Sequence, residues 1–282
     1  MPGAEYDYAV AGHVVVDVDA DTGARSPGGT ALYSGLQAAR LGCRTLVVTA
    51  GDPAELRELL APFAGEFELV VQPRPATTTF ITTGAGLRRR QRRAAWAGEI
   101  DDLGELECPI VHIAPVARET RGVRVASGTF VGVTPQGLIR SWDADGAPAY
   151  EPLDPALLQP RFDALVLDVV ERTYCEGVVA AAAAAGLAVA VTAAEDGVEV
   201  LGAGRAAVWL PAVPGVTVVD DLGAGDVFSA AFFIALRDGR DPLEAARFGQ
   251  AAAAIRIAGS GPDAVGSREA IDALHKGTRR SD

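Results

Sequence analysis

The chain has 282 residues, of which 49% are hydrophobic and 22% charged, and its formal net charge at pH 7 is −12. This composition supports a sizeable hydrophobic core and argues against global disorder. The acidic balance argues against nucleic acid or an anionic membrane as a partner, because binding to phosphate-rich surfaces needs a basic face.

The cysteines and the terminal segments predict a cytoplasmic protein. Cys43, Cys108 and Cys175 are widely spaced and follow no metal-binding pattern, so we expect three free thiols in a reducing compartment. The N-terminus has no basic segment followed by an apolar one, as a signal peptide would. The longest apolar run, Val178–Val191, is broken by Gly186 and is too short to span a bilayer.

The N-terminal half alternates short β-branched runs with segments of helical spacing. Strands are expected at Tyr8–Val18, Arg44–Ala50, Glu68–Gln72 and Thr77–Thr83. Helices are expected at Thr30–Leu41, ended by Gly42, and at Pro53–Phe63. The polar segment Asp19–Pro27 is expected to form a loop or a small hairpin.

The C-terminal half continues the same alternation. Strands are expected at Pro109–Ala114, Thr129–Val133, Ala164–Val169, Ala188–Thr192, Val198–Leu201, Ala207–Leu210 and Val216–Val219. Helices are expected at Cys175–Ala185, Val227–Arg237 and Leu243–Ile257. Strands that alternate with helices predict one α/β domain over residues 1–282, with a mostly parallel central sheet covered by helices on both faces.

A glycine-rich turn separates the strand expected at Val216–Val219 from the helix that begins at Val227. Its residues Gly223, Ala224 and Gly225 precede Asp226. The backbone N–H groups at such a helix start are unpaired and bind anions, and small residues let a phosphate approach closely. A carboxylate beside this anion site is the pair of groups that phosphorylation of a hydroxyl needs. In isolation, the same pattern is also compatible with an ordinary tight turn.

The motif Gly223-Ala224-Gly225-Asp226, followed by Val227-Phe228, resembles the C-terminal GAGD motif of the ribokinase-like (PfkB) carbohydrate and nucleoside kinases. Gly12 and Asp17 in the first strand, and then Gly28-Gly29 before a helix, resemble the N-terminal motifs of that family in order and spacing. The resemblance covers nearly the whole chain. It implies a three-layer α/β/α fold with a small, reduced β lid, whose elements we expect within residues 19–27 and 70–96.

The resemblance also implies functional residues. Asp226 would be the catalytic base, and Gly223, Ala224 and Gly225 would form the anion hole. It assigns substrate contacts to Asp17, Gly28, Gly29, Tyr33 and Arg140, nucleotide contacts to Thr192, Gly197 and Gln250, and water-mediated magnesium contacts to Glu171 and Asp168. ATP and Mg²⁺ are the implied cofactors, and the implied partner is a small molecule with a hydroxyl group.

Some residues depart from the family pattern. The family's usual acidic-Thr pair before GAGD is here Asp220-Asp221-Leu222, so the threonine hydroxyl is absent. In the family's Asn-x-x-Glu element, Asp168 stands in place of Asn. Tyr33 occupies the position where ribokinase itself has Asn. Ala193 and Ala194 follow the nucleotide threonine, where a glycine is common. These departures argue against ribose as the substrate.

Several features keep two interpretations. Residues 88–93 contain five arginines, which form either a solvated face or a cluster at the mouth of the active site. The segment Thr134–Arg140 is either a surface turn or the source of an arginine that faces phosphates or an acidic substrate. The threonines of Thr77–Phe80 either line the substrate pocket or belong to an ordinary strand. A monomer and a homodimer are both compatible with the sequence.

Two function hypotheses follow. The first is an ATP-dependent kinase that phosphorylates a sugar, a cyclitol or a nucleoside. The alternative is a non-catalytic relative that binds a small metabolite, which the intact GAGD motif disfavours and the altered nucleotide turn favours. A dinucleotide-binding dehydrogenase is excluded, because no GxGxxG motif follows the first strand.

Overall fold

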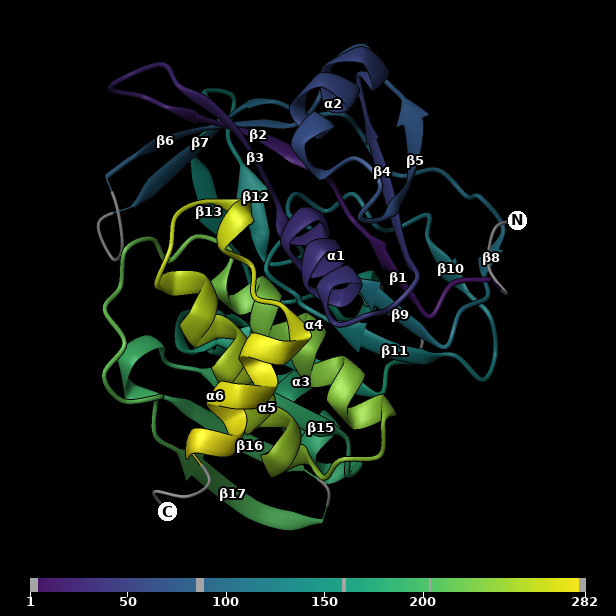
Figure 1. Cartoon of the computed structure of the whole chain (residues 1–282). Helices are drawn as coiled ribbons and strands as arrows, with labels where there is room; N and C mark the ends of the chain where they lie inside the picture. Colours follow the sequence, from purple (N-terminus) through teal and green to yellow (C-terminus); the bar gives the residue numbers. More distant parts are fainter. Residues whose placement is uncertain (1–4, 85–88, 159–160, 203, 279–282) are drawn as a thin grey trace.

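The computed structural model describes residues 5–84, 89–158, 161–202 and 204–278 (Figure 1). Within these residues the main sheet has nine strands, in the order β17-β16-β15-β14-β11-β9-β1-β4-β5. The seven strands from β15 to β5 in this order are parallel to one another. At the other end of the sheet, β16 and β17 are added in antiparallel pairing. The strands are β1 (Tyr8–Ala11), β4 (Thr45–Gly51), β5 (Glu68–Pro73), β9 (Ile110–Ile113), β11 (Phe130–Val133), β14 (Ala164–Asp168), β15 (Ala188–Thr192), β16 (Val198–Gly202) and β17 (Arg205–Leu210).

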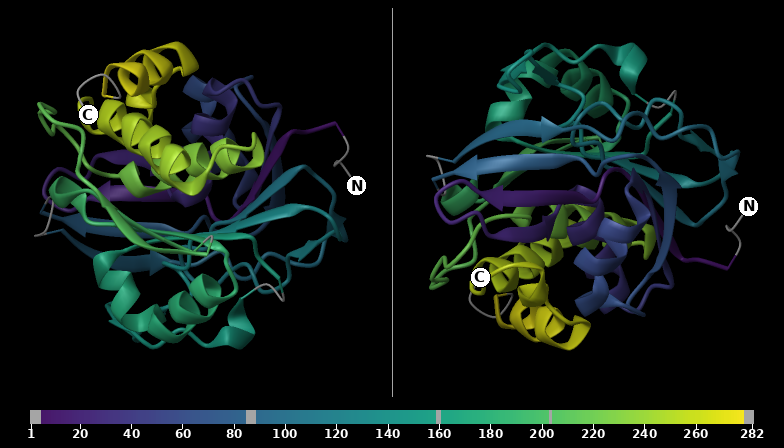
Figure 2. Two further views of the ribbon diagram at one scale, coloured as in Figure 1. Left: turned by 90° about the horizontal axis from the view of Figure 1, so that it is seen from below. Right: turned by 90° about the horizontal axis from the view of Figure 1, so that it is seen from above.

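Helices cover both faces of this sheet, as Figure 2 shows. One face carries α1 (Thr30–Arg40), α2 (Pro53–Leu59), α4 (Ala224–Arg237), α5 (Pro242–Ile257) and α6 (Arg268–Thr278). The other face carries α3 (Val169–Ala184). Two large apolar clusters fill the spaces between sheet and helices, one on each face. The three-layer α/β/α prediction is therefore confirmed.

A second sheet forms the lid. Its four strands lie in the order β3-β2-β6-β7 and comprise β2 (Val15–Asp19), β3 (Arg25–Gly28), β6 (Thr79–Thr83) and β7 (Arg90–Ala95). The hairpin of β12 (Arg140–Trp142) and β13 (Pro148–Tyr150) docks on β7, where the Arg93 N–H donates to the Gly146 carbonyl at 2.8 Å. Phe80 of the lid stacks on Trp142 of this hairpin. Further small elements are β8 (Glu105–Leu106) paired with β10 (Arg124–Val125), and single turns at Ala61–Phe63, Pro155–Leu157, Ala194–Asp196 and Pro262–Ala264.

The structure corrects several of the expected boundaries. The single strand expected at Tyr8–Val18 is split into β1 of the main sheet and β2 of the lid, because the chain passes between the sheets at Gly12. A Cβ at Gly12 would lie 2.1 Å from the Ala114 carbonyl oxygen, so only glycine fits. The lid strands β6 and β7 lie within the expected window of residues 70–96, whose first residues, 70–73, belong to β5 of the main sheet.

The strand expected at Val216–Val219 is an irregular segment. The Val219 N–H donates to the Ile257 carbonyl at 2.7 Å, at the end of α5. This backbone group pairs with a helix end rather than with a neighbouring strand, so the segment does not form a strand. It leads directly to the glycine-rich turn. Among the described helices, none is long and apolar enough to cross a membrane.

Candidate active site

The glycine-rich turn forms the first turn of α4. Gly223 precedes the helix with φ +79°, and a Cβ there would lie 2.5 Å from the Tyr33 ring. Both the backbone angle and the contact therefore require glycine at this position. Within the described residues the N–H groups of Gly223 and Gly225 have no acceptor, whereas the Ala224 N–H donates to the Asp221 carbonyl at 3.2 Å. The turn thus offers free donors at the positive end of a helix, but Ala224 is not one of the free donors expected.

Asp226 lies in this first turn and is half-buried. Its carboxylate accepts a hydrogen bond from the Thr30 hydroxyl at the start of α1. Burial raises the pKa of Asp226 to about 6, against the opposing effects of the Thr30 hydrogen bond and of the charges on Arg140 and Arg256. The Asp226 carbonyl accepts from Ser34 Oγ at 3.0 Å, so α1 supports both ends of this residue.

Asp17 reaches the same region from the lid. It lies on β2, is 7% exposed, and its Oδ1 atom has no hydrogen-bond partner within the described residues. A Cβ at Gly28 would lie 1.9 Å from Asp17 Oδ2, so Gly28 leaves room for this carboxylate. Burial raises the pKa of Asp17 to about 6; the charge of Arg89 opposes the rise, and Asp226 and Asp220 add to it. The lid and the α4 turn therefore bring the two carboxylates into electrostatic contact, although they are far apart in sequence.

Gly29 lies at the start of α1 with φ +90°, where a Cβ would lie 2.5 Å from the His13 carbonyl oxygen. The helix therefore begins directly against the segment that joins β1 to β2. This packing places Thr30, the next residue, against Asp226. Close packing therefore requires glycine at both position 28 and position 29. This requirement is independent of the substrate contact expected from the sequence.

Tyr33 corrects an expectation. Its side chain is 1% exposed and lies behind Gly223, with the hydroxyl 3.4 Å from Arg256 Nη2. Burial raises the pKa of Tyr33 to about 12. A ring enclosed in this way supports the turn from the core side and does not face a substrate.

Glu171 and Asp168 meet at the junction of β14 and α3. They form a capping box, in which Asp168 Oδ1 accepts from the Glu171 N–H at 2.7 Å and Glu171 Oε2 accepts from the Asp168 N–H at 3.0 Å. Burial, reinforced by Asp168, raises the pKa of Glu171 to about 7. No cluster of three His, Cys, Asp or Glu side chains suited to a metal ion is found in the described part of the chain. Two neighbouring carboxylates fit the magnesium expected here if it is held through water rather than by direct ligands.

The residues expected to contact the nucleotide lie on and after β15, the strand that pairs with β14. Thr192 ends β15 directly opposite Asp168 of β14. Gly197 has φ +119°, and a Cβ there would lie 2.1 Å from the Leu210 carbonyl oxygen. The Gln250 amide already donates to the Pro211 carbonyl at 2.8 Å, so this side chain ties α5 to the segment after β17. The NH₂ group of Gln250 thus makes a structural contact, and the nucleotide contact expected of this residue stays a prediction.

The arginine-rich segment reaches the site. The Arg89 guanidinium lies 2.6 Å from Asp221 and 3.9 Å from Asp220, just before the glycine-rich turn. Arg88, the first arginine of the run, lies outside the described residues. Arg140 carries a buried Nε atom without a partner among the described residues, and its charge lowers the pKa of both Asp226 and Glu171. Both arginines therefore face the predicted catalytic region.

Sequence reasoning missed three supporting residues. Thr30 bonds the Asp226 carboxylate, and Arg256 and Asp220 hold the turn through a partly buried ion pair of 2.6 Å. Asp220 is the acidic residue of the pattern that precedes GAGD, which was a usable signal. The sequence held no signal for Arg256, because its position on a helix cannot be told from that of a surface arginine.

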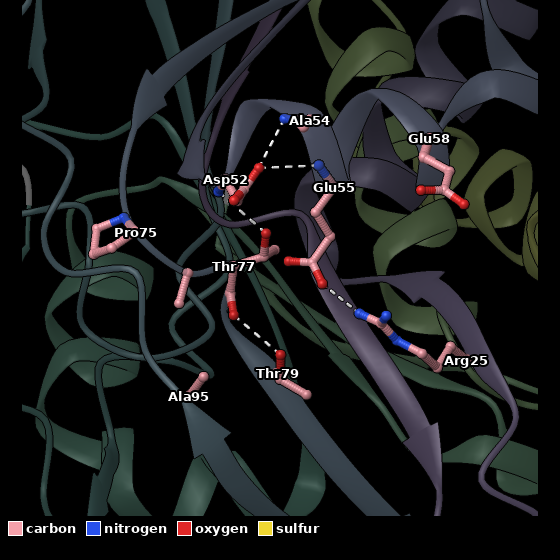
Figure 3. A pocket seen from close by; sticks show the side chains of 10 residues that line it. Arg25, Asp52, Ala54, Glu55, Glu58, Pro75, Thr77, Thr79 and Ala95 are labelled. Carbon is pink, nitrogen blue, oxygen red and sulfur yellow. Dashed lines mark hydrogen bonds and ion pairs between the residues drawn. The ribbon is translucent and has the colours of Figure 1, made fainter.

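A shallow cavity of about 460 Å³ lies between α2 and the lid, and Figure 3 shows its lining. Arg25 and Thr79 line it, on the lid face opposite Asp17, because alternate strand residues point to opposite faces. Its polar groups pair with one another: Arg25 with Glu55, and Thr77 with the Asp52 N–H (Figure 3). This cavity is therefore separate from the region of Asp17 and Asp226.

The threonines of the β6 segment make internal contacts. Thr78 Oγ1 lies 2.8 Å from His13 Nδ1 and accepts from the Ala97 N–H, and the Thr79 hydroxyl donates to the Thr77 carbonyl. Phe80 shares a face of the lid with Asp17, whereas Thr79 lies on the opposite face. The interpretation of an ordinary strand therefore fits the threonines better than that of a substrate wall.

Comparisons with known proteins agree with this geometry. Residues 172–268 match the model of the pfkB family carbohydrate kinases. Three solved structures are similar over nearly the whole chain. Arabidopsis thaliana ribokinase complexed with ribose and ATP has a TM-score of 0.74 and 20% identity, over 96% of this chain and 99% of that one. A pyrophosphate-dependent myo-inositol-1 kinase converted by mutation into a myo-inositol-3 kinase has a TM-score of 0.73 and 20% identity, over 96% of this chain and 99% of that one. The Methanocaldococcus jannaschii nucleoside kinase has a TM-score of 0.74 and 15% identity, over 98% of this chain and 100% of that one. The chain has the ribokinase fold, and its segment 172–268 carries the sequence features of the pfkB carbohydrate kinases.

Proposed function

We propose that the protein is a kinase that transfers the γ-phosphoryl group of ATP to a hydroxyl group of a small sugar, a cyclitol or a nucleoside. The observation that carries this proposal is the arrangement at the start of α4. A carboxylate with a pKa of about 6 lies beside free backbone N–H groups, and a second buried carboxylate, Asp17, faces it from the lid. A general base and an anion site side by side are what phosphoryl transfer to a hydroxyl requires.

Asp17 would orient the acceptor by accepting hydrogen bonds from its hydroxyls, since an ionised carboxylate has acceptor capacity on both oxygens and Oδ1 is unused. Gly28 and Gly29 would let the acceptor approach the backbone at the head of α1. Arg140 would face the donor phosphates or an acidic group of the acceptor. These contacts would bring the reacting hydroxyl next to Asp226.

In the chemical step the acceptor oxygen forms a bond to the γ-phosphorus, the bond from that phosphorus to the β,γ-bridging oxygen breaks, and ADP leaves. Asp226 takes the proton of the attacking hydroxyl, and the N–H groups of Gly223 and Gly225 stabilise the charge on the transferred group. Thr192 and Gly197 would lie at the nucleotide. Glu171 and Asp168 would hold the waters of a magnesium ion, which neutralises phosphate charge when bound.

The test is a panel of sugars, cyclitols and nucleosides with ATP and magnesium, followed by ADP release and by mass spectrometry of the phosphorylated acceptor. Wild type and Asp226→Asn are assayed in parallel, and pyrophosphate replaces ATP in a second set. Acceptor-dependent ADP formation by wild type alone supports the proposal. Phosphorylation with pyrophosphate alone would overturn ATP as the donor.

The second candidate, a non-catalytic metabolite-binding relative, is favoured by one observation: an acidic residue, Asp221, stands where the family pattern has a threonine. Binding of a panel compound without turnover by wild type would establish this alternative over the kinase.

A further inference from the structure

An ion pair joins the lid to the catalytic turn. Arg89 directly precedes β7 of the lid, and Asp221 lies two residues before Gly223. Arg89 Nη2 lies 2.6 Å from Asp221 Oδ1, and the two residues are 132 positions apart in sequence. The Arg89 side chain is 22% exposed, so the pair is partly shielded from solvent.

The surroundings of this pair are acidic. Asp17, Asp220, Asp221 and Asp226 all lie around the turn where an anionic phosphoryl donor is proposed to bind. The guanidinium of Arg256 already bonds Asp220 from the core side. Arg89 is the cation whose charge most lowers the pKa of Asp17, so its field reaches the acceptor side as well as the turn.

The neighbouring arginines do not share this position. The side chain of Arg90 donates to the Arg89 carbonyl, and that of Arg92 donates to the Asp145 carbonyl. The Arg93 guanidinium lies over the rings of Trp96 and Trp142. Of the described arginines in this run, Arg89 alone is paired with a carboxylate. It is therefore the one that links the run to the active site.

We propose that the Arg89–Asp221 pair is a positioning device with two effects, resting on the function proposed above. First, it holds the lid strands over the catalytic turn, which places Asp17 opposite Asp226. Second, Arg89 neutralises Asp221, so that an anionic donor binds at a turn that would otherwise repel it. The pair thus gives one reason for both the arginine-rich segment and the aspartate at position 221.

The first experiment needs no substrate. Hydrogen exchange is followed by mass spectrometry in peptides covering residues 89–96 of wild type, Asp221→Asn and Arg90→Ala. Loss of a tertiary contact increases local opening, so we expect exchange of the β7 amides to be about fivefold faster in Asp221→Asn. Arg90→Ala is the matched control and should exchange as wild type does. Equal exchange in wild type and Asp221→Asn overturns the positioning role, whether or not the protein is a kinase.

The second experiment separates the two effects by kinetics. Arg89→Ala leaves the charge of Asp221 uncompensated, so the donor KM should rise about tenfold. Asp221→Asn breaks the pair but also removes the charge that repels the donor, so the donor KM should stay within about twofold of the wild-type value. Both variants should raise the acceptor KM, because the lid loses its attachment in each.

The double variant Arg89→Ala/Asp221→Asn should recover most of the donor affinity that Arg89→Ala loses. The charge-reversed variant R89D/D221R should bring the acceptor KM back toward the wild-type value, since the pair is restored with opposite polarity. Arg90→Ala, with the same change in net charge as Arg89→Ala, should change neither KM. Equal donor KM values in Arg89→Ala and Arg90→Ala would overturn the electrostatic role, and a charge reversal without recovery would overturn the pairing.

Discussion

The Arg256 guanidinium donates to Asp220 Oδ2 at 2.6 Å from a fully buried position beneath the glycine-rich turn. It also bonds the Gly259 carbonyl at 3.1 Å and lies over the Tyr33 ring. Asp220 in turn accepts from the N–H groups of Leu222 and Gly261. Burial opposes ionisation of Asp220, but the hydrogen bonds from Arg256 and from these N–H groups outweigh it and lower its pKa. One buried cation therefore connects α5, α1 and the turn that carries Asp226.

Arg256→Ala should destabilise the protein strongly. The substitution leaves Asp220 without its main counter-charge in a partly buried site, for which losses of about 3 kcal/mol in the free energy of unfolding are typical. Chemical denaturation measures this loss, and Arg237→Ala, at an exposed position of α4, is the control expected to change stability little. A stability equal to that of the Arg237 variant would contradict the role of the ion pair.

Asp226→Asn should keep the fold and remove most of the turnover. The amide is nearly isosteric and still interacts with Thr30, but it cannot take the proton of the attacking hydroxyl, so a loss of roughly 10²–10⁴-fold in kcat is expected. Thermal melting and ADP formation are measured on the same preparation, with the exposed Asp238→Asn as control. A folded variant with near-normal turnover would show that Asp226 is only a turn residue.

The pH dependence of turnover should follow the ionisation of Asp226. Its pKa in the unliganded protein is raised to about 6, and only the ionised form accepts a proton, so kcat/KM should rise with pH through about 6 and level off above it. Removing the buried positive charge of Arg256, where Arg256→Gln folds, should move this limb to higher pH, because that charge lowers the pKa of Asp226. A profile that is flat between pH 5 and pH 8 would not fit a base with this pKa.

Asp17→Asn should weaken acceptor binding and stabilise the unliganded protein at pH 8. Burial raises the pKa of Asp17 from 3.8 to about 6, so the folded state binds its proton more tightly than the unfolded state does. The stability associated with this proton is present below about pH 4 and is lost as pH rises through about 6. We therefore expect a higher melting temperature for the variant at pH 8, a smaller difference at pH 5, and a raised acceptor KM. An unchanged acceptor KM would place the acceptor elsewhere.

Glu171→Gln should lower turnover and raise the magnesium concentration needed for half-maximal rate, by about tenfold or more. An amide still caps α3 but has no negative charge for the waters of a metal ion. Glu176→Gln, at an exposed position of the same helix, is the matched control. Magnesium titrations of the two variants should separate, and coincident curves would exclude Glu171 from the metal site.

Features that depend on neighbouring residues alone were predictable from the amino-acid sequence. Alternating strands and helices indicate the three-layer architecture, because hydrophobic periodicity is a local property. The GAGD turn likewise predicts an anion site at a helix start, because the free N–H groups follow from the helix itself. The failed strand at Val216–Val219 shows the limit of such reasoning: its β-branched residues fit a strand, but the available backbone partner was the end of α5.

Contacts between residues far apart in the chain could not be predicted in this way. Burial of Tyr33 behind Gly223, the pairing of Arg256 with Asp220, and the contact of Arg89 with Asp221 all join segments that are far apart in the chain. An arginine on a helix or at the end of a hairpin looks the same in sequence whether it faces solvent or a carboxylate. The difference arises from the packing of α1, α4, α5 and the lid around one turn, which places each charge where burial and its neighbours change its ionisation.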